Sequence, residues 1–274
     1  MMSEEEQNTQ GGVQANNNST AVGKIEVGGS IGGDMVIGGT HNYYASPADA
    51  KSPLTTEKIE REFFEPETIL IPDGPLWMGS DSGEGINKEY DTPRHEVFLP
   101  AFRIGKYPVA NAQYEEFIRQ TGKFVTPVMG WDGQKVPNGL ESNPVMGITW
   151  YDALAYCKWL SDMTKRKYSI PNAAQLEKAY QGSYGCSDII DNIHQWTCTL
   201  WGEKRKSPDL KYRLPWKDDG RNNLNANSQI RRIVCVYTKM NDNDSRRLCS
   251  RTGQFPEDVG LPGARHSFRV VMSI

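Results

Sequence analysis

Helical periodicity is confined to a few stretches of this chain, and this limits the fold more than any other feature of the sequence. Residues 111–123, NAQYEEFIRQTGK, carry apolar or aromatic side chains three and four positions apart, which predicts an amphipathic helix. We expect Asn111 to cap this helix and Gly122 to end it. Residues 149–165, TWYDALAYCKWLSDMTK, present a wider apolar stripe behind Thr149 and predict a second, buried helix.

The rest of the chain indicates short strands joined by long ordered loops. Pro171 and Asn172 introduce only a short third helix. Residues 67–80 and 95–110 each predict two short strands, and about a hundred C-terminal residues are rich in Asn, Asp, Gly and Trp without helical periodicity. We therefore expect an α+β fold with few helices. Six of the 7 tryptophans are expected in its core: Trp77, Trp150, Trp159, Trp196, Trp201 and Trp216.

Residues 1–60 differ in amino-acid composition from the domain expected at residues 61–274. They open with a polar, Asn-rich stretch and continue with KIEVGGSIGGDMVIGG at residues 24–39, where short apolar pieces are split by glycine pairs. Such pieces suit two or three very short strands, which cannot bury their faces alone. This Gly/Asn-rich extension is therefore either a flexible tether or local hairpin, or a contact with a partner or a sister subunit through residues 24–39.

Charge and cysteine usage exclude several classes of protein. Lys and Arg number 31 against 34 Asp and Glu, a net charge of −3, which offers no general attraction to nucleic acid. No apolar run approaches the roughly 18 residues of a membrane span, and the acidic, polar start is unlike a secretory signal, so we expect a cytoplasmic protein without a membrane partner. The 5 cysteines form no CxxC pair, so most thiols should be buried and inert.

From about residue 66 to its end the chain resembles the formylglycine-generating enzyme family, also called the sulfatase-modifying factor domain family. The resemblance lies in ordered blocks, which read IPDGPLWMGS, TPRHEVFLPAFRIGKYPVANAQYEEFI, NPVMGITWYDALAYCKWL, SIPNAAQLEKAY, YGCSDIIDNIHQWTCTLWG, YRLPWKDDGRNNL and HSFRVV. It covers about three quarters of the sequence and implies a variant of the C-type lectin fold. The long insert that the family carries after Gly182 is missing here.

The resemblance also bears on catalysis. Catalytic members of the family carry two cysteines, five positions apart, that bind copper and activate oxygen. The resemblance places these positions near Thr238 and Asn243, whose side chains cannot supply the soft thiolate ligands of copper(I). Cys235 and Cys249 are the nearest sulfurs, but they are 14 residues apart and fall in the wrong blocks. We therefore expect no enzyme, no catalytic residue, no resident metal and no cofactor.

The strongest departures from the family pattern lie between Cys235 and His266, while IRRIV before and FRVV after stay close to it. This resembles the variable proteins of diversity-generating retroelements, in which a C-terminal cassette is displayed as a ligand-binding surface. The stretch mixes aromatic, amide and charged groups without periodicity, which suits loop-borne recognition. The predicted ligand-binding residues are Tyr237, Lys239, Asn241, Asn243, Thr252, Gln254, Phe255, Glu257, Asp258, Leu261, Arg265 and His266. Taken singly, each is also compatible with an ordinary solvated loop.

The remaining chemical motifs indicate structural roles. Asp242 and Asp244 are the best placed acids for a weak metal site, but calcium needs six to eight converging oxygens. His41, His95, His194 and His266 are far apart in the sequence and assemble neither a triad nor a zinc helix. His194 stands where the family has Trp, so we expect it to be packed or hydrogen-bonded. Trp131 lies between turn residues and is a candidate ligand contact.

Three functions are compatible with these observations. The leading hypothesis is a non-catalytic binding protein that presents its C-terminal loops to a protein or other macromolecular ligand. The second is a formylglycine-generating or related copper or iron oxygenase with altered ligands. The third is an accessory recognition module of a prokaryotic defence or signalling assembly, docked through residues 24–39.

Overall fold

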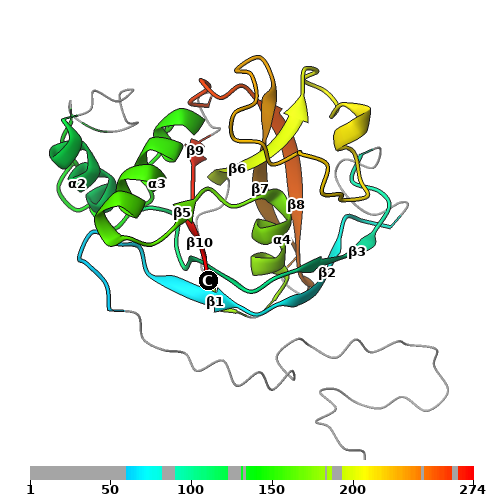
Figure 1. Ribbon diagram of the computed structural model, residues 1–274, viewed down its shortest axis with the longest axis horizontal. Coiled ribbons are helices and arrows are strands. Elements are labelled where there is room, and N and C mark those ends of the chain that lie inside the picture. The colour runs from blue at the N-terminus through cyan, green and yellow to red at the C-terminus, as the bar shows by residue number, and fades with distance from the viewer. Residues whose placement is uncertain are drawn as a thin grey trace, which may run out of the picture. The chain divides into compact units, whose positions relative to one another are not determined.

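The computed structural model describes residues 60–274 of this chain (Figure 1), except for residues 82–89, 123–130, 132–133, 183, 187–192, 242–243 and 261–264. Of residues 237–241 and 244–249 it describes only the backbone. The predicted N-terminal extension, with the candidate docking segment at residues 24–39, lies outside the described residues. None of the helices within the described residues has the length and apolar character that a membrane crossing requires.

Two four-stranded sheets and one hairpin form the scaffold. The first sheet has the order β1 (Thr68–Ile71), β4 (Phe102–Gly105), β10 (Val271–Ser273) and β5 (Tyr168–Ser169). The hairpin pairs β2 (Gly74–Met78) with β3 (His95–Leu99). The second sheet has the order β8 (Asp244–Gln254), β7 (Arg231–Asn241), β6 (Ile193–Gly202) and β9 (Arg265–Ser267). Neighbouring strands are antiparallel except β6 and β9, which run parallel.

The end of the chain joins the two sheets. Strand β9 lies at the edge of the second sheet, and β10, a few residues later, lies inside the first. In Figure 1 this red segment passes between helices α2 (Asn111–Thr121) and α3 (Trp150–Thr164) on one side and strands β6–β8 on the other. Between the two strands, the carbonyls of Phe268 and Val270 accept hydrogen bonds from the backbone amides of Val109 and Gly105 at 3.0 and 2.8 Å.

The three predicted helices are confirmed as α2 (Asn111–Thr121), α3 (Trp150–Thr164) and α4 (Ala173–Gln181). A short 3₁₀ turn, η3 (Leu210–Tyr212), follows β6. Thr149 caps α3 by accepting from the Asp152 amide at 3.0 Å, and Asn172 caps α4 by accepting from the Gln175 amide at 2.8 Å. Gly122 ends α2 with a φ of 59°, a left-handed conformation that favours glycine.

The predicted cap of α2 was wrong by one position. Ala110 occupies the cap, and its amide donates to the Gln113 side chain at 3.0 Å. Asn111 is instead the first helical residue, because its side chain is engaged elsewhere: it donates to the Leu140 carbonyl at 2.8 Å and accepts from the Trp131 indole at 3.0 Å. These bonds anchor the loop that follows α2 to the start of that helix.

Two apolar clusters fill the space around the sheets. The first packs α2 and α3 against the C-terminal segment through an aromatic stack, in which Tyr156 contacts Tyr114, Phe117 and Phe268 at ring-centroid distances of 5.4–5.9 Å. The second cluster joins α4 to the β2–β3 hairpin and to Trp201. Both clusters consist mainly of fully buried side chains, so they supply most of the hydrophobic stabilisation.

Five of the six tryptophans predicted to lie in the core are buried or partly buried, and Trp77 is exposed. Trp150, Trp159, Trp196 and Trp201 are buried and Trp216 is partly buried, as expected. Trp77 is 38% exposed, because Leu76 and Met78 on either side of it face the core and adjacent strand residues point to opposite faces.

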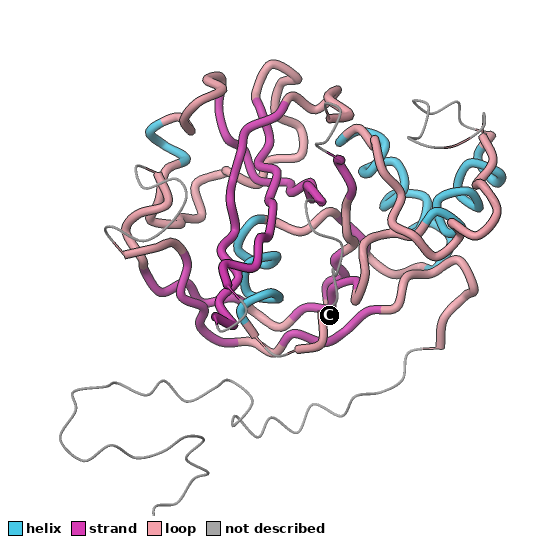
Figure 2. Tube along the Cα trace, turned by 180° about the vertical axis from the view of Figure 1, so that it is seen from behind, coloured by secondary structure: helices cyan, strands magenta, loops and turns pink. Residues whose placement is uncertain are grey.

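The strands of the second sheet are longer than the sequence suggested. Strand β6 has 10 residues and β7 and β8 have 11 each, and the last two run side by side in Figure 2. Nearly every residue of β6 is buried, so both faces of this strand are covered and its sequence shows no alternation of apolar and polar residues. The pattern that identifies a half-buried strand is therefore lacking.

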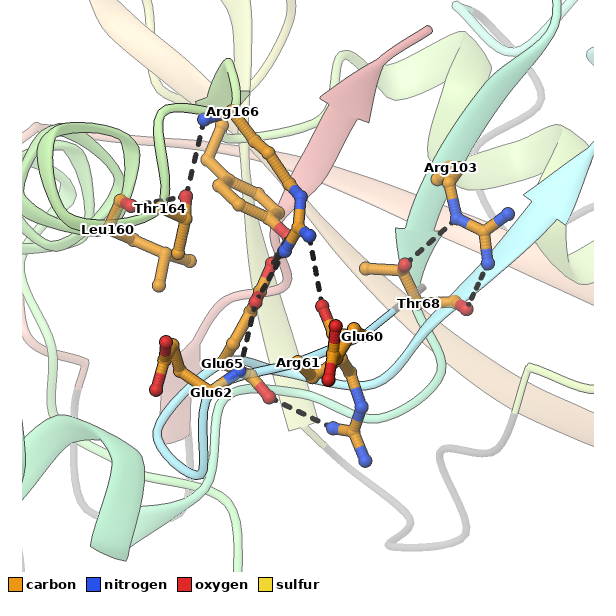
Figure 3. Close-up of polar contacts among 10 residues, drawn as sticks. Glu60, Arg61, Glu62, Glu65, Thr68, Arg103, Leu160, Thr164 and Arg166 are labelled. Atoms are coloured by element: carbon orange, nitrogen blue, oxygen red, sulfur yellow. Dashed lines mark hydrogen bonds and ion pairs between the residues drawn. The ribbon is translucent and has the colours of Figure 1, made fainter. Parts of the chain in front are cut away.

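Glu65 holds the beginning of the described chain on the domain (Figure 3). Arg166 donates to both carboxylate oxygens of Glu65 at 2.6 and 2.7 Å, and the Tyr168 hydroxyl also donates to this carboxylate. Arg166 reaches the Glu60 carbonyl at 2.9 Å, while Arg61 donates to the Glu65 carbonyl at 2.9 Å. Glu65 is only 1% exposed. Without Arg166, its carboxylate would be a buried charge that lacks its counter-ion.

We predict that Arg166→Ala lowers the free energy of unfolding by about 2–3 kcal/mol, because one partner of a mostly buried ion pair is removed. Lys158→Ala is the matched control. Lys158 pairs with Asp162 at 2.7 Å, but both side chains are more than 60% exposed, so its loss should cost at most about 0.5 kcal/mol. Urea unfolding of the two variants checks this, and equal losses would contradict it.

Candidate ligand-binding pocket near the C-terminus

The structure places the predicted ligand-binding residues on strands more than on loops. Tyr237, Lys239 and Asn241 lie in β7, Thr252 and Gln254 in β8, and Arg265 and His266 in β9. Only Phe255, Glu257 and Asp258 belong to a described loop. Asn243 and Leu261 lie outside the described residues, and the side chains of Tyr237, Lys239 and Asn241 are not described. The expectation that loops carry this surface was therefore wrong for the strand residues, whose pairing the sequence pattern did not show.

Five of the twelve predicted residues line one pocket of about 450 Å³. They are Gln254, Phe255, Glu257, Asp258 and His266, and the other lining residues are Arg205, Arg231, Val259 and Gly260. Thr252 and Arg265 are described but do not line it. Sequence reasoning missed both arginines: Arg231 lies in the block IRRIV, which keeps to the family pattern, and Arg205 lies in the basic run Lys204–Lys206. This basic run was the one sequence feature that could have pointed to an arginine of the pocket.

The loop from Phe255 to Asp258 is a rigid wall of the pocket. The Asp258 carboxylate accepts from the Phe255 amide at 3.0 Å, and the Asp258 amide donates to the Phe255 carbonyl at 2.9 Å. The Pro256 carbonyl accepts from the amide of Trp150, the first residue of α3, at 2.9 Å. These three bonds fix the backbone of the loop to itself and to the start of α3.

Arg231 and Phe255 form the apolar and cationic part of the pocket. The Arg231 guanidinium carbon lies 3.6 Å from the centroid of the Phe255 ring, a close cation–π contact. Burial lowers the pKa of Arg231, and the Asp258 carboxylate opposes this shift. The guanidinium still carries its charge at neutral pH, so a ligand meets a positive group stacked on an aromatic face. Arg205 and Glu257 are exposed at the same pocket.

His266 lines the pocket as a buried residue and not as the exposed side chain expected from the sequence, and its role in ligand binding stays a prediction. It is 1% exposed because β9 is covered on both sides: β6 pairs with it, and its own carbonyl accepts from the Gly147 and Ile148 amides at 2.9 and 3.2 Å. Its ring Nδ1 lies 3.2 Å from the Asp258 carbonyl oxygen, and the Trp196 ring packs against it with centroids 4.7 Å apart. Burial lowers the pKa of His266.

His194 lies beside His266, an association that sequence reasoning missed. The two residues are direct partners in the parallel β6–β9 pairing, and their ring centroids are 5.8 Å apart. Burial lowers the pKa of His194 to about 4, and His266 acts in the same direction. The expectation that His194 is packed fits its partial burial. No signal along the sequence connects these histidines, because only the strand pairing brings them together.

The described thiols are poor candidates for copper chemistry. Cys157, Cys198 and Cys235 are buried, and Cys186 is partly buried. Burial raises the pKa of Cys157, and it raises the pKa of Cys198 to about 12, so both remain protonated and uncharged at neutral pH. Within the described residues, no three His, Cys, Asp or Glu side chains form a group that could hold a metal ion. The candidate metal residue Asp242 lies outside those residues, and the side chain of Asp244 is not described.

Trp131 is not the exposed ligand contact that its turn context suggested. Its indole nitrogen donates to Asn111, and its ring packs edge-on against Tyr114 with centroids 6.3 Å apart. This places Trp131 against the aromatic cluster of α2 and α3, away from the residues that line the pocket.

Comparison with known proteins identifies the family. Residues 54–231, more than half of the chain, match the sulfatase-modifying factor enzyme 1-like domain family. The chain belongs to this family. The formylglycine-generating enzyme of Streptomyces coelicolor is 26% identical over 201 residues, which cover 57% of this chain and 59% of that protein. The inactive C-alpha-formylglycine-generating enzyme 2 of Mus musculus is 21% identical over 277 residues, which cover 71% of this chain and 89% of that protein.

Family membership leaves the catalytic status open, since the relatives include one protein named as an enzyme and one named as inactive. The chain also spans only 25–59% of the length of several relatives that it matches. The structure of PvdO from Pseudomonas aeruginosa superposes with a TM-score of 0.53 at 16% identity, covering 77% of this chain and 96% of PvdO. This likeness concerns the fold, and the predicted α+β fold of the formylglycine-generating enzyme type is confirmed.

We predict that His194→Asn makes stability less sensitive to acid. Because the pKa of folded His194 is about 4, below its usual 6.5, the unfolded chain binds more protons there, and stability falls as the pH drops through this range. The variant should avoid on the order of 1–2 kcal/mol of that loss between pH 7 and 4.5, after allowance for partial exposure of the ring.

The measurement is urea unfolding of both proteins at the two pH values. Burial raises the pKa of Asp91 to about 6, which acts in the opposite sense, but Asp91 is present in both proteins and cancels in the comparison. Equal losses of stability on acidification in wild type and variant would contradict the prediction.

Proposed function

We propose that this member of the family is a non-catalytic binding protein, which holds a macromolecular ligand at the pocket between β8, β9 and the Phe255–Asp258 loop. The observation that supports it most is that five of the residues in the segment departing from the family pattern line one pocket. Five side chains predicted independently of the structure line it. A loop fixed to α3 and a guanidinium stacked on Phe255 give that pocket a defined shape.

The composition of the pocket favours a protein ligand. It combines an aromatic ring, two guanidinium groups, two carboxylates and one amide, the mixture that adaptable protein-recognition surfaces use. Arg205 and Glu257 are exposed there and are free to make charged contacts at the rim, whereas the Arg231–Phe255 pair offers a partly buried anchor. We further propose that positions from Cys235 to His266, on strands as well as in loops, vary as in retroelement variable proteins.

The available metal donors support the proposal that this protein is not catalytic. The positions that correspond to the copper-binding cysteines, Thr238 and Asn243, have no sulfur, and burial keeps the Cys157 and Cys198 thiols protonated. Copper(I) chemistry needs a pair of soft thiolates at one place. The family frame is therefore used here for holding a ligand.

Ligand binding is tested by quantitative affinity capture from cells that express the natural protein, with the full chain as bait. We expect Phe255→Ala and Arg205→Glu to reduce the captured partner at least tenfold, because they remove the aromatic anchor and reverse a rim charge. The control bait carries Lys158→Ala and Asp162→Ala, an exposed pair on α3, and should retain the partner. Capture that is unchanged by both pocket substitutions would show that the pocket is not the binding site.

The enzyme alternative makes a different prediction. Copper-loaded full-length protein, mixed with a cysteine-containing peptide and a thiol reductant, should consume oxygen no faster than the same copper concentration without protein. Mass spectrometry should find the peptide cysteine unchanged. Turnover that is lost in a Cys235→Ser variant would overturn the proposal in favour of an oxidase with altered ligands.

The third hypothesis depends on residues outside the described structure. A chain that lacks residues 1–59 should keep the pocket-dependent partner if the pocket is the recognition site. It should lose that partner if residues 24–39 are the docking element. The same capture experiment therefore separates the two.

A further inference from the structure

The parallel pairing of β6 with β9 places two imidazole rings side by side. His194 and His266 are direct partners in this pairing, their ring centroids are 5.8 Å apart, and the rings are tilted by 37°. His266 is 1% exposed, and it lines the pocket described above. The proximity of the two rings follows from strand pairing between segments that are distant in the sequence.

The hydrogen bonding of His266 determines which nitrogen carries its lone pair. Its Nδ1 lies 3.2 Å from the Asp258 carbonyl oxygen, which can only accept, so Nδ1 carries the hydrogen in this contact. In the neutral ring, Nε2 is then an acceptor. Within the described residues, this buried Nε2 has no hydrogen-bond partner, and neither has the buried Nδ1 of His194. Two adjacent rings thus each present one unsatisfied nitrogen.

Buried nitrogens without a hydrogen-bond partner destabilise the folded state, and here two of them lie beside each other. A buried polar group without a partner destabilises a fold by about 1–3 kcal/mol. An apolar pair at these positions would avoid that cost, and the family resemblance gives Trp in place of His194. Two such nitrogens side by side offer two lone pairs to a group bound between the rings.

The geometry suits a metal ion shared by both rings. Imidazole nitrogens bind zinc at about 2.0–2.1 Å, so the centroids of two rings on one ion lie about 5–6 Å apart. Metal-binding histidines also commonly donate their other ring N–H to a backbone carbonyl, as His266 does to Asp258. We propose that His194 and His266 bind one divalent transition-metal ion of the zinc, nickel or copper(II) type through His266 Nε2 and His194 Nδ1.

Two protein ligands leave further positions on the ion open. Within the described residues no third His, Cys, Asp or Glu completes a group, so water or a donor atom of a molecule in the pocket must fill them. Burial lowers the pKa of both rings, and neutral imidazole is the form that binds metals. The affinity should accordingly be lower than that of a closed structural zinc site with four protein ligands. This inference is independent of the proposed ligand and of any catalysis.

The test uses the full chain, purified without a histidine tag and stripped with a chelator, and titrates it with Zn²⁺ in a calorimeter. We expect one ion per chain. His194→Asn should weaken binding at least tenfold, because one of the two imidazole ligands is lost. His95→Asn is the matched control, since both ring nitrogens of His95 are occupied: Nδ1 lies 2.9 Å from the Pro93 carbonyl oxygen, and Nε2 accepts from the Trp216 amide at 2.7 Å.

A spectroscopic measurement on the wild type does not depend on variants that fold. In long-range ¹H–¹⁵N spectra of the imidazoles, Zn²⁺ should change the ¹⁵N chemical shifts of His266 Nε2 and His194 Nδ1. The ¹⁵N chemical shifts of His95 should not change. Three results would overturn the proposal: no stoichiometric Zn²⁺ binding, binding that persists at full strength in His194→Asn, or Zn²⁺ shifts confined to other histidines. His194 is only partly buried, so its Asn variant is the safer substitution.

Discussion

The buried guanidinium of Arg269 holds the two sheets of this domain together. Its Nε donates to the Gln195 side chain in β6 at 2.9 Å, and one terminal nitrogen donates to the carbonyls of Gly105 and Lys106, at the end of β4, at 2.8 and 2.6 Å. Arg269 is fully buried, so its charge must be met by acceptors from both sides. Since Arg269 stands between β9 and β10, these bonds fix the segment that places one strand in each sheet.

The pocket and the histidine pair follow from this arrangement. Just before this segment, β9 pairs in parallel with β6, and His266 lies against Trp196 and His194. The Phe255–Asp258 loop is then bounded by α3 on one side and by the Asp258–His266 contact on the other. The proposed binding pocket therefore rests on elements fixed by hydrogen bonds, which lowers the conformational entropy that ligand binding would cost.

Membership of the sulfatase-modifying factor family and the proposed loss of catalysis are compatible in physical terms. The positions that hold the frame, such as Arg269, Trp196 and the caps of α3 and α4, interact with the backbone and with the core, and these contacts do not depend on chemistry at the site. These frame contacts are therefore compatible with different functions on one fold, and for this chain we propose ligand binding.

The sequence by itself determined the features that depend on local order along the chain. The spacing of Tyr114 and Phe117, the Thr149 and Asn172 caps and Gly122 as the end of α2 all act within a few residues, so their physical signal is complete in the sequence. The ordered blocks likewise revealed the family and thus the fold. Only the tertiary structure decided that Trp77 faces solvent, that Arg231 stacks on Phe255 and that His194 meets His266. Each of these depends on which strands pair and in what register, and a register between distant segments leaves no local pattern to read.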